Sequence, residues 1–296
     1  MNWQPLQQIP EINGGDMPGD ICLIKPMHLD KANCLFPLLW EQLQETLSKS
    51  THGKAVVAIC GGSGTGKTEC AQLVAYMLSE LNVGAYALSG DNYPYRIPMY
   101  NDAERLNIFR NEGIKELLAR SIYSAEKYEI LKELQKADID SDPAQVKNYP
   151  WLAYYQEAGD CGLRSYLGTH KEHDFVGLSA IITQFKAGAN PIYLKRMGRE
   201  VASTWYQRVD FSETSVLIIE WTHGNSDNLR GIDIPVLLYS TPEETLEHRK
   251  ARGRDKGADS PFTTRVLHIE GELLRAGAHR AKIIVSNQNT LMEALP

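Results

Sequence analysis

Eight consecutive residues, Gly61 to Thr68, have the types and the spacing of a phosphate-binding loop. They read Gly-Gly-Ser-Gly-Thr-Gly-Lys-Thr and satisfy the pattern G-x-x-x-x-G-K-[ST]. The glycines let backbone N–H groups approach phosphate oxygens, the Lys67 ammonium adds a full charge, and the Thr68 hydroxyl can ligate Mg²⁺. The loop predicts that the chain binds a nucleoside triphosphate together with Mg²⁺.

The segments on either side of the loop supply the context that the pattern needs. The apolar run 55–60 predicts a buried strand, and residues 69–78 predict a helix. The start of such a helix points free N–H groups and a positive dipole end at the phosphates. A glycine-rich turn that matches by chance is the alternative, and both flanks argue against it.

Two acidic residues at the ends of predicted strands could complete a phosphotransfer site. Glu220 ends the strand predicted over 215–220, where a phosphate-loop protein holds Mg²⁺ or a water bound to it. Asp91 follows the strand predicted over 85–89, and a carboxylate beside the terminal phosphate can accept the proton of an attacking hydroxyl. The alternatives are a solvated carboxylate at Glu220 and a turn cap at Asp91.

Three arginines follow a predicted helix start at Thr241, where Thr-Pro-Glu-Glu has the residues of an N-cap and first turn. Arg249, Arg252 and Arg254 lie on this helix or just beyond it. They suit a lid that closes over phosphates, with Arg249 binding nucleotide and the other two stabilising charge on the transferred group. The alternative is a solvated helix end that carries cations.

Composition limits the class of protein and its partners. The chain has 296 residues, of which 43% are apolar and 23% charged, enough for one large α/β domain or a domain with an insertion. The net charge of −6 argues against a nucleic-acid partner. The chain starts without a signal peptide and has no membrane-length apolar run, so we expect a cytoplasmic protein. Its five cysteines are expected to be reduced, with Cys70 in a packing role.

Strand and helix signals alternate along most of the chain. Residues 1–52 predict a loose arm, a short strand at 21–24 and a packing helix. Residues 53–296 predict an α/β domain with a parallel sheet, interrupted at about 100–172 by an insertion of amphipathic helices. Beyond the insertion we predict a helix near 174–186 and extended segments at 191–194, 215–220, 235–239 and 281–285.

These motifs together resemble the uridine kinase and phosphoribulokinase family of P-loop small-molecule kinases. The loop, Asp91 followed by Tyr93, the Val-Leu-Ile-Ile-Glu strand and the Arg-Gly-Arg-Asp run carry the resemblance, over roughly 53–100 and 174–286. It implies a nucleoside-kinase-like P-loop NTPase fold, the use of ATP and Mg²⁺, Asp91 as base, Tyr93 in the acceptor pocket and Glu220 at the metal.

The residues assigned to nucleotide binding are Gly61, Gly62, Ser63, Gly64, Thr65, Gly66, Lys67, Thr68 and Arg249. Those assigned to catalysis are Lys67, Asp91, Arg252 and Arg254, and those assigned to Mg²⁺ are Thr68 and Glu220. The acceptor candidates are Asp91, Tyr93, Arg96, Tyr193 and Arg196.

The chain also departs from uridine kinases near the acceptor. Trp221-Thr222-His223-Gly224 stands where a glycine usually follows the acidic strand, and no histidine follows Tyr193 to read a pyrimidine. Uridine is therefore disfavoured, and Lys195, Arg196 and Arg199 would suit an anionic acceptor, although surface cations often serve solubility alone. His170, His173 and Asp174 have the types of metal ligands, but packing is the expected role.

The leading hypothesis is an ATP-dependent phosphotransferase acting on a hydroxyl of a small-molecule acceptor: a nucleoside, a sugar or a related metabolite. The alternative is a nucleotide-gated regulatory ATPase acting on a protein partner; a third, that the chain binds ATP without catalysis, is opposed by the intact acidic and basic residues. The insertion is expected to shape the acceptor pocket or to form a homo-oligomer contact.

Overall fold

A computed structural model gives the arrangement of most of the chain. It describes residues 3–12, 14–19, 22–198, 200, 203–252 and 260–295, with Ala251 and Arg252 described by their backbone only. No helix in these ranges is long and apolar enough to cross a membrane.

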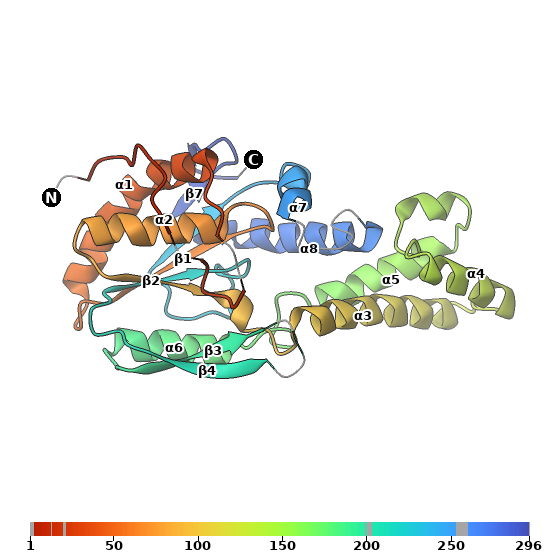
Figure 1. Cartoon of the computed structure of the whole chain (residues 1–296). Helices are drawn as coiled ribbons and strands as arrows, with labels where there is room; N and C mark the ends of the chain where they lie inside the picture. Colours follow the sequence, from red (N-terminus) through yellow and green to blue (C-terminus); the bar gives the residue numbers. More distant parts are fainter. Residues whose placement is uncertain are drawn as a thin grey trace.

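A six-stranded sheet lies at the centre of the protein (Figure 1). Its order is β2–β5–β1–β6–β7–β8, and every neighbouring pair from β2 to β7 is parallel, whereas β8 is antiparallel to β7. The strands are β1 (Ala55–Gly61), β2 (Ala85–Ser89), β5 (Val216–Glu220), β6 (Ile234–Leu238), β7 (Ile283–Val285) and β8 (Leu291–Met292). All seven residues of β1 are buried, as expected for the middle strand of a parallel sheet. The α/β prediction is confirmed.

Helices and a hairpin cover the two faces of the sheet. Helices α1 (Pro26–Lys49) and α2 (Lys67–Glu80) pack on one face, where Val57 and Ile59 of β1 point. Helix α6 (Phe175–Lys186) and the antiparallel hairpin of β3 (Ile192–Met197) and β4 (Thr204–Val209) cover the other face, where Val56 of β1 and Leu217 of β5 point. The period-two alternation of each strand thus divides the core into two layers.

The segment predicted as an insertion is helical and projects from the sheet as an arm (Figure 1). It contains α3 (Pro98–Ala119), α4 (Ala125–Lys136), the short 3-10 helix η2 (Pro143–Lys147) and α5 (Leu152–Arg164). Helices α3 and α5 approach closely because Gly113 and Gly159 face the rings of Tyr155 and Phe109, where a Cβ would come within 2.4 Å of ring carbons.

Helix α8 (Pro261–Gly277) joins this arm to the sheet. Arg265 of α8 donates to Asp160 at 2.7 Å and to Gln156 at 2.6 Å, both on α5. Val266 and Ile269 of α8 are buried in the same hydrophobic cluster as the arm residues. The arm is therefore fixed to a helix that also reaches the edge of the sheet carrying the phosphate loop (Figure 1).

Three local predictions differ from the structure. No strand forms at 22–24, where Leu23 is 63% exposed and has no sheet to pack against. Thr241 and Glu244 exchange the hydrogen bonds of a capping box, but residues 242–245 form turns, so α7 begins only at Leu246 and ends at Arg252. Strands β4 and β8 were not predicted, because β4 is polar and mostly exposed and β8 has two residues.

The burial of two cysteines predicts their reactivity. Burial raises the pKa of both the Cys60 and the Cys70 thiol to about 12, which leaves almost no thiolate at neutral pH. Cys161 on α5 is exposed. At pH 8 we expect an aromatic disulfide reagent to label Cys161 quickly and to label Cys60 and Cys70 only after denaturation.

Mass spectrometry of the labelled peptides measures this order. The variant Cys161→Ser should lose the fast phase, and rapid labelling of Cys70 in the folded variant would contradict the packing assigned to it.

Candidate active site

The register of the sheet brings the predicted acids to the phosphate loop. Glu220 pairs with Ile59 of β1 on one side and with Ser89 of β2 on the other. Two residues beyond these partners the chain reaches Gly61, where the loop begins, and Asp91. Parallel strands end on the same edge of a sheet, so the loop, Asp91 and Glu220 share one edge.

The loop takes the shape that its glycines allow. Gly64 and Gly66 have φ angles of 81° and 83°, in the left-handed region that favours glycine. Gly66 is the N-cap of α2, so Lys67 and Thr68, the last two residues of the loop, already belong to the first turn of the helix with its free N–H groups. The Lys67 ammonium donates to the Gly62 carbonyl at 3.0 Å and thus lies over the loop. The loop therefore has the backbone shape that an anion-binding cradle requires.

A buried lysine that the sequence analysis missed supports the loop from beneath. Lys31 of α1 is 1% exposed, and its Nζ donates to the Thr65 carbonyl at 3.0 Å. Burial lowers the pKa of Lys31, since the charged form loses water. His28, one turn earlier, lies against Gly66, where a Cβ would be 2.9 Å from its ring. Helical spacing alone gave no sign that this face of α1 meets the loop.

Thr68 and Glu220 have the geometry of a shared metal site. The Thr68 hydroxyl donates to Glu220 Oε2 at 3.2 Å, and Glu220 is 4% exposed. Burial raises the pKa of Glu220 to about 8; the charge of Asp91 adds to this rise and Lys67 opposes it. A buried carboxylate that is costly to ionise beside a second acid fits a cation, and a hydroxyl and a carboxylate are the oxygen ligands that Mg²⁺ prefers.

Asp91 lies on a short 3-10 turn, η1 (Gly90–Asn92), directly after β2. Its side chain is exposed, unlike that of Glu220, and it is near enough to affect the pKa values of Glu220 and Glu270. Gly90 must be glycine because a Cβ there would fall 2.1 Å from the Trp221 ring. Asp91 is therefore open to an incoming molecule next to the loop.

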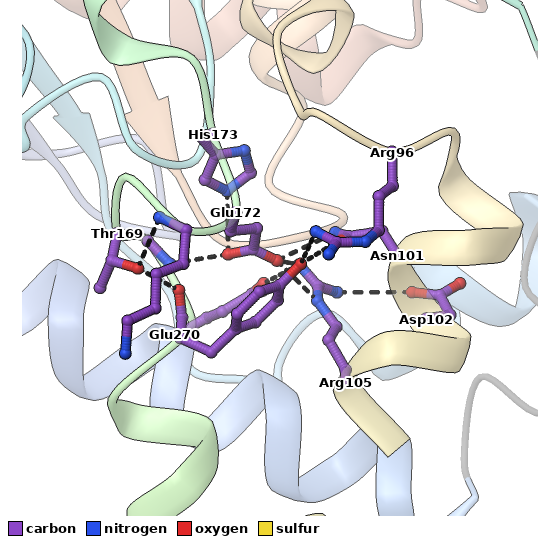
Figure 2. Close-up of polar contacts among 11 residues, drawn as sticks. Arg96, Asn101, Asp102, Arg105, Thr169, Glu172, His173 and Glu270 are labelled. Atoms are coloured by element: carbon purple, nitrogen blue, oxygen red, sulfur yellow. Dashed lines mark hydrogen bonds and ion pairs between the residues drawn. The ribbon is translucent and has the colours of Figure 1, made fainter. Parts of the chain in front are cut away.

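A polar network that was not predicted joins the arm to the core and to α8 (Figure 2). Arg105 of α3 lies 2.6 Å from Glu172 and 3.3 Å from Glu270 of α8. Burial raises the pKa of Glu270 to about 6, and Arg105 opposes this rise. Burial would also raise the pKa of Glu172, but a hydrogen bond from His173 and the charge of Arg105 hold it well below its usual range. Arg105 thus ties the arm to both the core and α8.

The histidines suggested as metal ligands fall into a different group. His173 lies with Glu172 and His223, all buried, with one ligand atom from each within 4.8 Å of the others. His173 Nε2 is 3.0 Å from Glu172 Oε2, and burial lowers the pKa of His223 well below its usual value. Arg105 compensates the Glu172 charge, so a cation is not required for this group to be buried, and packing stays the prediction for His173.

The predicted lid is described in part. Arg249 is 5% exposed; its guanidinium donates to the Pro242 carbonyl and the Thr245 hydroxyl, both at 2.7 Å, and its stem lies against Gly64. Its stem therefore lies beside the loop, while its guanidinium is bonded within the turn that precedes α7. Arg252 ends α7, its side chain is outside the described residues, and Arg254 lies outside them altogether.

The predicted acceptor residues other than Asp91 do not gather at one place. Tyr93 is 2% exposed and packs in the core beside α6, and Tyr193 is 57% exposed on the hairpin. Arg96 donates to the Tyr166 hydroxyl at 3.1 Å. Arg196 is 3% exposed and forms an ion pair with Asp16 at 2.9 Å. The sequence suggested that these side chains bind the acceptor, but it did not reveal the partners of Arg96 and Arg196 or the burial of Tyr93.

Comparisons with known proteins bear on this site. No family model matches the chain. It is 37% identical over 256 residues to the bifunctional alpha-galactosidase/sucrose kinase AgaSK of Mediterraneibacter gnavus, a match that covers 86% of the chain and 22% of that protein. The chain thus corresponds to less than a quarter of that relative's length.

Solved structures with a similar fold include two bacterial proteins. One is a putative fructose transport system kinase from Silicibacter sp. TM1040, with a TM-score of 0.49 and 15% identity, covering 81% of this chain and 94% of that one. The other is a possible uridine kinase from Bacillus stearothermophilus, with a TM-score of 0.44 and 14% identity, covering 83% of this chain and 98% of that one. The phosphate loop on β1, with Glu220 beside it, gives the chain the site of a P-loop protein, and its sequence is similar to part of a relative named a sucrose kinase.

The raised pKa of Glu220 predicts proton release when magnesium and nucleotide bind. With a pKa of about 8 the free carboxyl is mostly protonated at pH 7, and a bound cation requires the ionised form. We expect release of about 0.9 proton per binding event at pH 7 and less as the pH rises past 8. Titration calorimetry in buffers of different ionisation enthalpy measures this number.

Glu220→Gln should abolish the release, and Glu213→Gln, an exposed acid just before the same strand, should leave it unchanged. Equal proton release in Glu220→Gln and in the unsubstituted protein would contradict the role given to this carboxylate.

Proposed function

We propose that the chain transfers the terminal phosphoryl group of ATP to a hydroxyl group of a small-molecule acceptor, with Mg²⁺ as cofactor. The observation that carries the proposal is the meeting of Lys67, Asp91 and Glu220 at one edge of the sheet. A loop for phosphates, a buried acid for a cation and an open carboxylate beside them are the parts that phosphotransfer requires.

Each residue has a separate task in this reaction. The loop amides and Lys67 hold the phosphates and offset negative charge, while Thr68 and Glu220 hold Mg²⁺, which neutralises charge on the phosphate oxygens. Asp91 orients the acceptor hydroxyl and takes its proton as the oxygen attacks phosphorus; the bond from phosphorus to the ADP oxygen breaks and ADP leaves. The arginines of the lid add positive charge beside the phosphates; these are Arg249, Arg252 and Arg254.

The acceptor is proposed to be a neutral polyhydroxyl compound, a sugar. Two of the three cations that suggested an anionic acceptor have other partners: Arg196 pairs with Asp16, and Lys195 donates to the Pro94 carbonyl at 2.7 Å. The third, Arg199, lies outside the described residues. Near Asp91 lies Glu270, whose pKa of about 6 leaves its carboxyl mostly ionised at pH 7, and this charge repels an anionic acceptor. The relative AgaSK is named a sucrose kinase, which supports a sugar and makes sucrose the first candidate.

The regulatory ATPase stays the alternative, with a protein partner in place of a metabolite. The match to a relative named a sucrose kinase favours the kinase, because an exposed Asp91 could equally orient the water that an ATPase uses as its nucleophile. A cytoplasmic location, the absence of a nucleic-acid partner and a homo-oligomer stay predictions.

Replacing Asp91 by Asn should remove turnover and leave nucleotide binding intact. The amide keeps the shape but accepts no proton at neutral pH, so kcat should fall by about 10² to 10⁴. A coupled assay of ADP release with sucrose and other sugars measures kcat, and fluorescence of an ATP analogue measures binding.

Asp227→Asn, an exposed acid paired with Arg280, is the matched control and should keep full activity. Unchanged kcat in Asp91→Asn, with a control of equal activity, would remove Asp91 from the mechanism.

Replacing Glu270 by Gln should affect the acceptor more than ATP. Glu270 pairs with Arg105 and is near enough to Asp91 for that charge to raise its pKa, and we propose that its carboxylate accepts hydrogen bonds from sugar hydroxyls. We expect KM for the sugar to rise about tenfold, the loss of one hydrogen bond to a charged group, while KM for ATP stays within about twofold.

Glu272→Gln, on the same helix but paired with exposed Arg164, tests whether any loss of acid on α8 has this effect. If Glu270→Gln raised both KM values equally, Glu270 would have no specific contact with the acceptor.

A further inference from the structure

The N-terminal segment before α1 contributes one buried carboxylate, that of Asp16, to the turn that carries Asp91. The side chain of Asp16 is 5% exposed. Its Oδ2 accepts a hydrogen bond from the Ser89 backbone N–H at 3.0 Å and another from Asn92 Nδ2 at 3.3 Å. Ser89 and Asn92 stand on either side of Gly90 and Asp91, so Asp16 holds both ends of this turn.

The same carboxylate is held in turn by two other residues. Arg196 NH1 lies 2.9 Å from Asp16 Oδ2, and the Tyr86 hydroxyl donates to Oδ1. Arg196 NH2 also donates to the Tyr86 hydroxyl, at 2.7 Å, and its Nε donates to Gln207. A buried carboxylate with several donors is well fixed, because moving it would leave each donor without a partner.

The opposite sides of the turn are also restrained. Asn92 Oδ1 accepts a hydrogen bond from the Met197 backbone N–H at 2.9 Å, which joins the turn to the hairpin. Trp221 packs directly against Gly90. Among the described residues no hydrogen bond reaches the Asp91 carboxylate itself, so its place relative to the loop depends on the backbone of the turn.

We propose that Asp16 is a positioning residue for Asp91: it clamps the turn from Ser89 to Asn92 so that the Asp91 carboxylate faces the acceptor beside the phosphate loop. The proposal rests on the proposed function, because it assigns Asp16 a part in phosphotransfer. It also gives Arg196, a suggested acceptor residue, a different task, that of holding Asp16 in place. Small displacements of a catalytic group reduce rates strongly; an error of 1 Å costs about a hundredfold.

The central test is a double-mutant cycle between positions 16 and 91. Asp16→Asn should lower kcat by about tenfold to hundredfold, with KM for ATP within about twofold of the unsubstituted protein. In the Asp91→Asn background the same substitution should change the single-turnover rate by less than about twofold, because no carboxylate remains to be positioned.

Two control variants separate positioning from loss of packing. Tyr86→Phe removes a hydrogen bond to Asp16 Oδ1 but leaves the contacts of Oδ2 with the turn, so it should lower the melting temperature without a tenfold loss of kcat. Glu11 is an exposed acid of the same N-terminal segment as Asp16, and Glu11→Gln should change neither the melting temperature nor kcat. Hydrogen exchange of the Ser89 amide, which donates to Asp16, should be faster in Asp16→Asn and normal in both controls.

Distinct results would overturn the proposal. An equal loss of rate from Asp16→Asn with and without Asp91 would mean that Asp16 acts on the fold in general. Unchanged kcat, or unchanged exchange at Ser89, in a folded Asp16→Asn variant would remove the clamp while leaving the kinase proposal standing. Absence of phosphotransfer in the unsubstituted protein with every sugar tested would instead refute the proposed function, and the role of Asp16 with it.

Discussion

The site depends on the pairing of one acidic strand between two others. Because β5 lies between β1 and β2, Glu220 is held between Ile59 and Ser89, and the chain leaves both neighbours toward the same edge. That register brings the loop and the Asp91 turn to either side of a buried carboxylate. A slip of one residue in β5 would turn Glu220 to the other face of the sheet and would bring apolar side chains to the edge.

Burial on both faces fixes this register. Val56 and Leu217 fill the layer beneath α6, while Val57 and Ile218 fill the layer beneath α1 and α2. The cost of the fixed position is a carboxyl whose pKa burial raises to about 8, next to an exposed acid and a lysine. Ionising this buried carboxyl costs free energy, and the apolar, closely packed core around it holds it in place despite that cost. A cation bound beside Glu220 would favour the ionised form, so ligand binding would be coupled to the loss of the Glu220 proton.

Patterns of neighbouring residues predicted the parts of the protein whose structure depends on local sequence. The loop, the apolar strands and the acids at their ends could be recognised because parallel-sheet physics puts strand ends together. Long-range partners could not: Asp16 lies 180 positions from Arg196, and Arg105 meets Glu172 and Glu270 only because the arm folds back on α8. Arg196 was assigned to the acceptor by residue type and Tyr93 by the family resemblance, and neither argument could reveal that the structure buries both side chains. The strand β4 is mostly exposed and lacks the alternation of apolar and polar residues that would have predicted a strand.

The central claim is that the phosphoryl group goes to an acceptor hydroxyl and not to water. Phosphorus NMR of the purified protein with ATP, Mg²⁺ and sucrose, followed by other neutral sugars, tests it most directly. The account predicts a new phosphomonoester signal that grows in equal amount with ADP and is lost in Asp91→Asn. Inorganic phosphate as the only product beside ADP, with every sugar and at the same rate without one, would contradict the account and favour the regulatory ATPase.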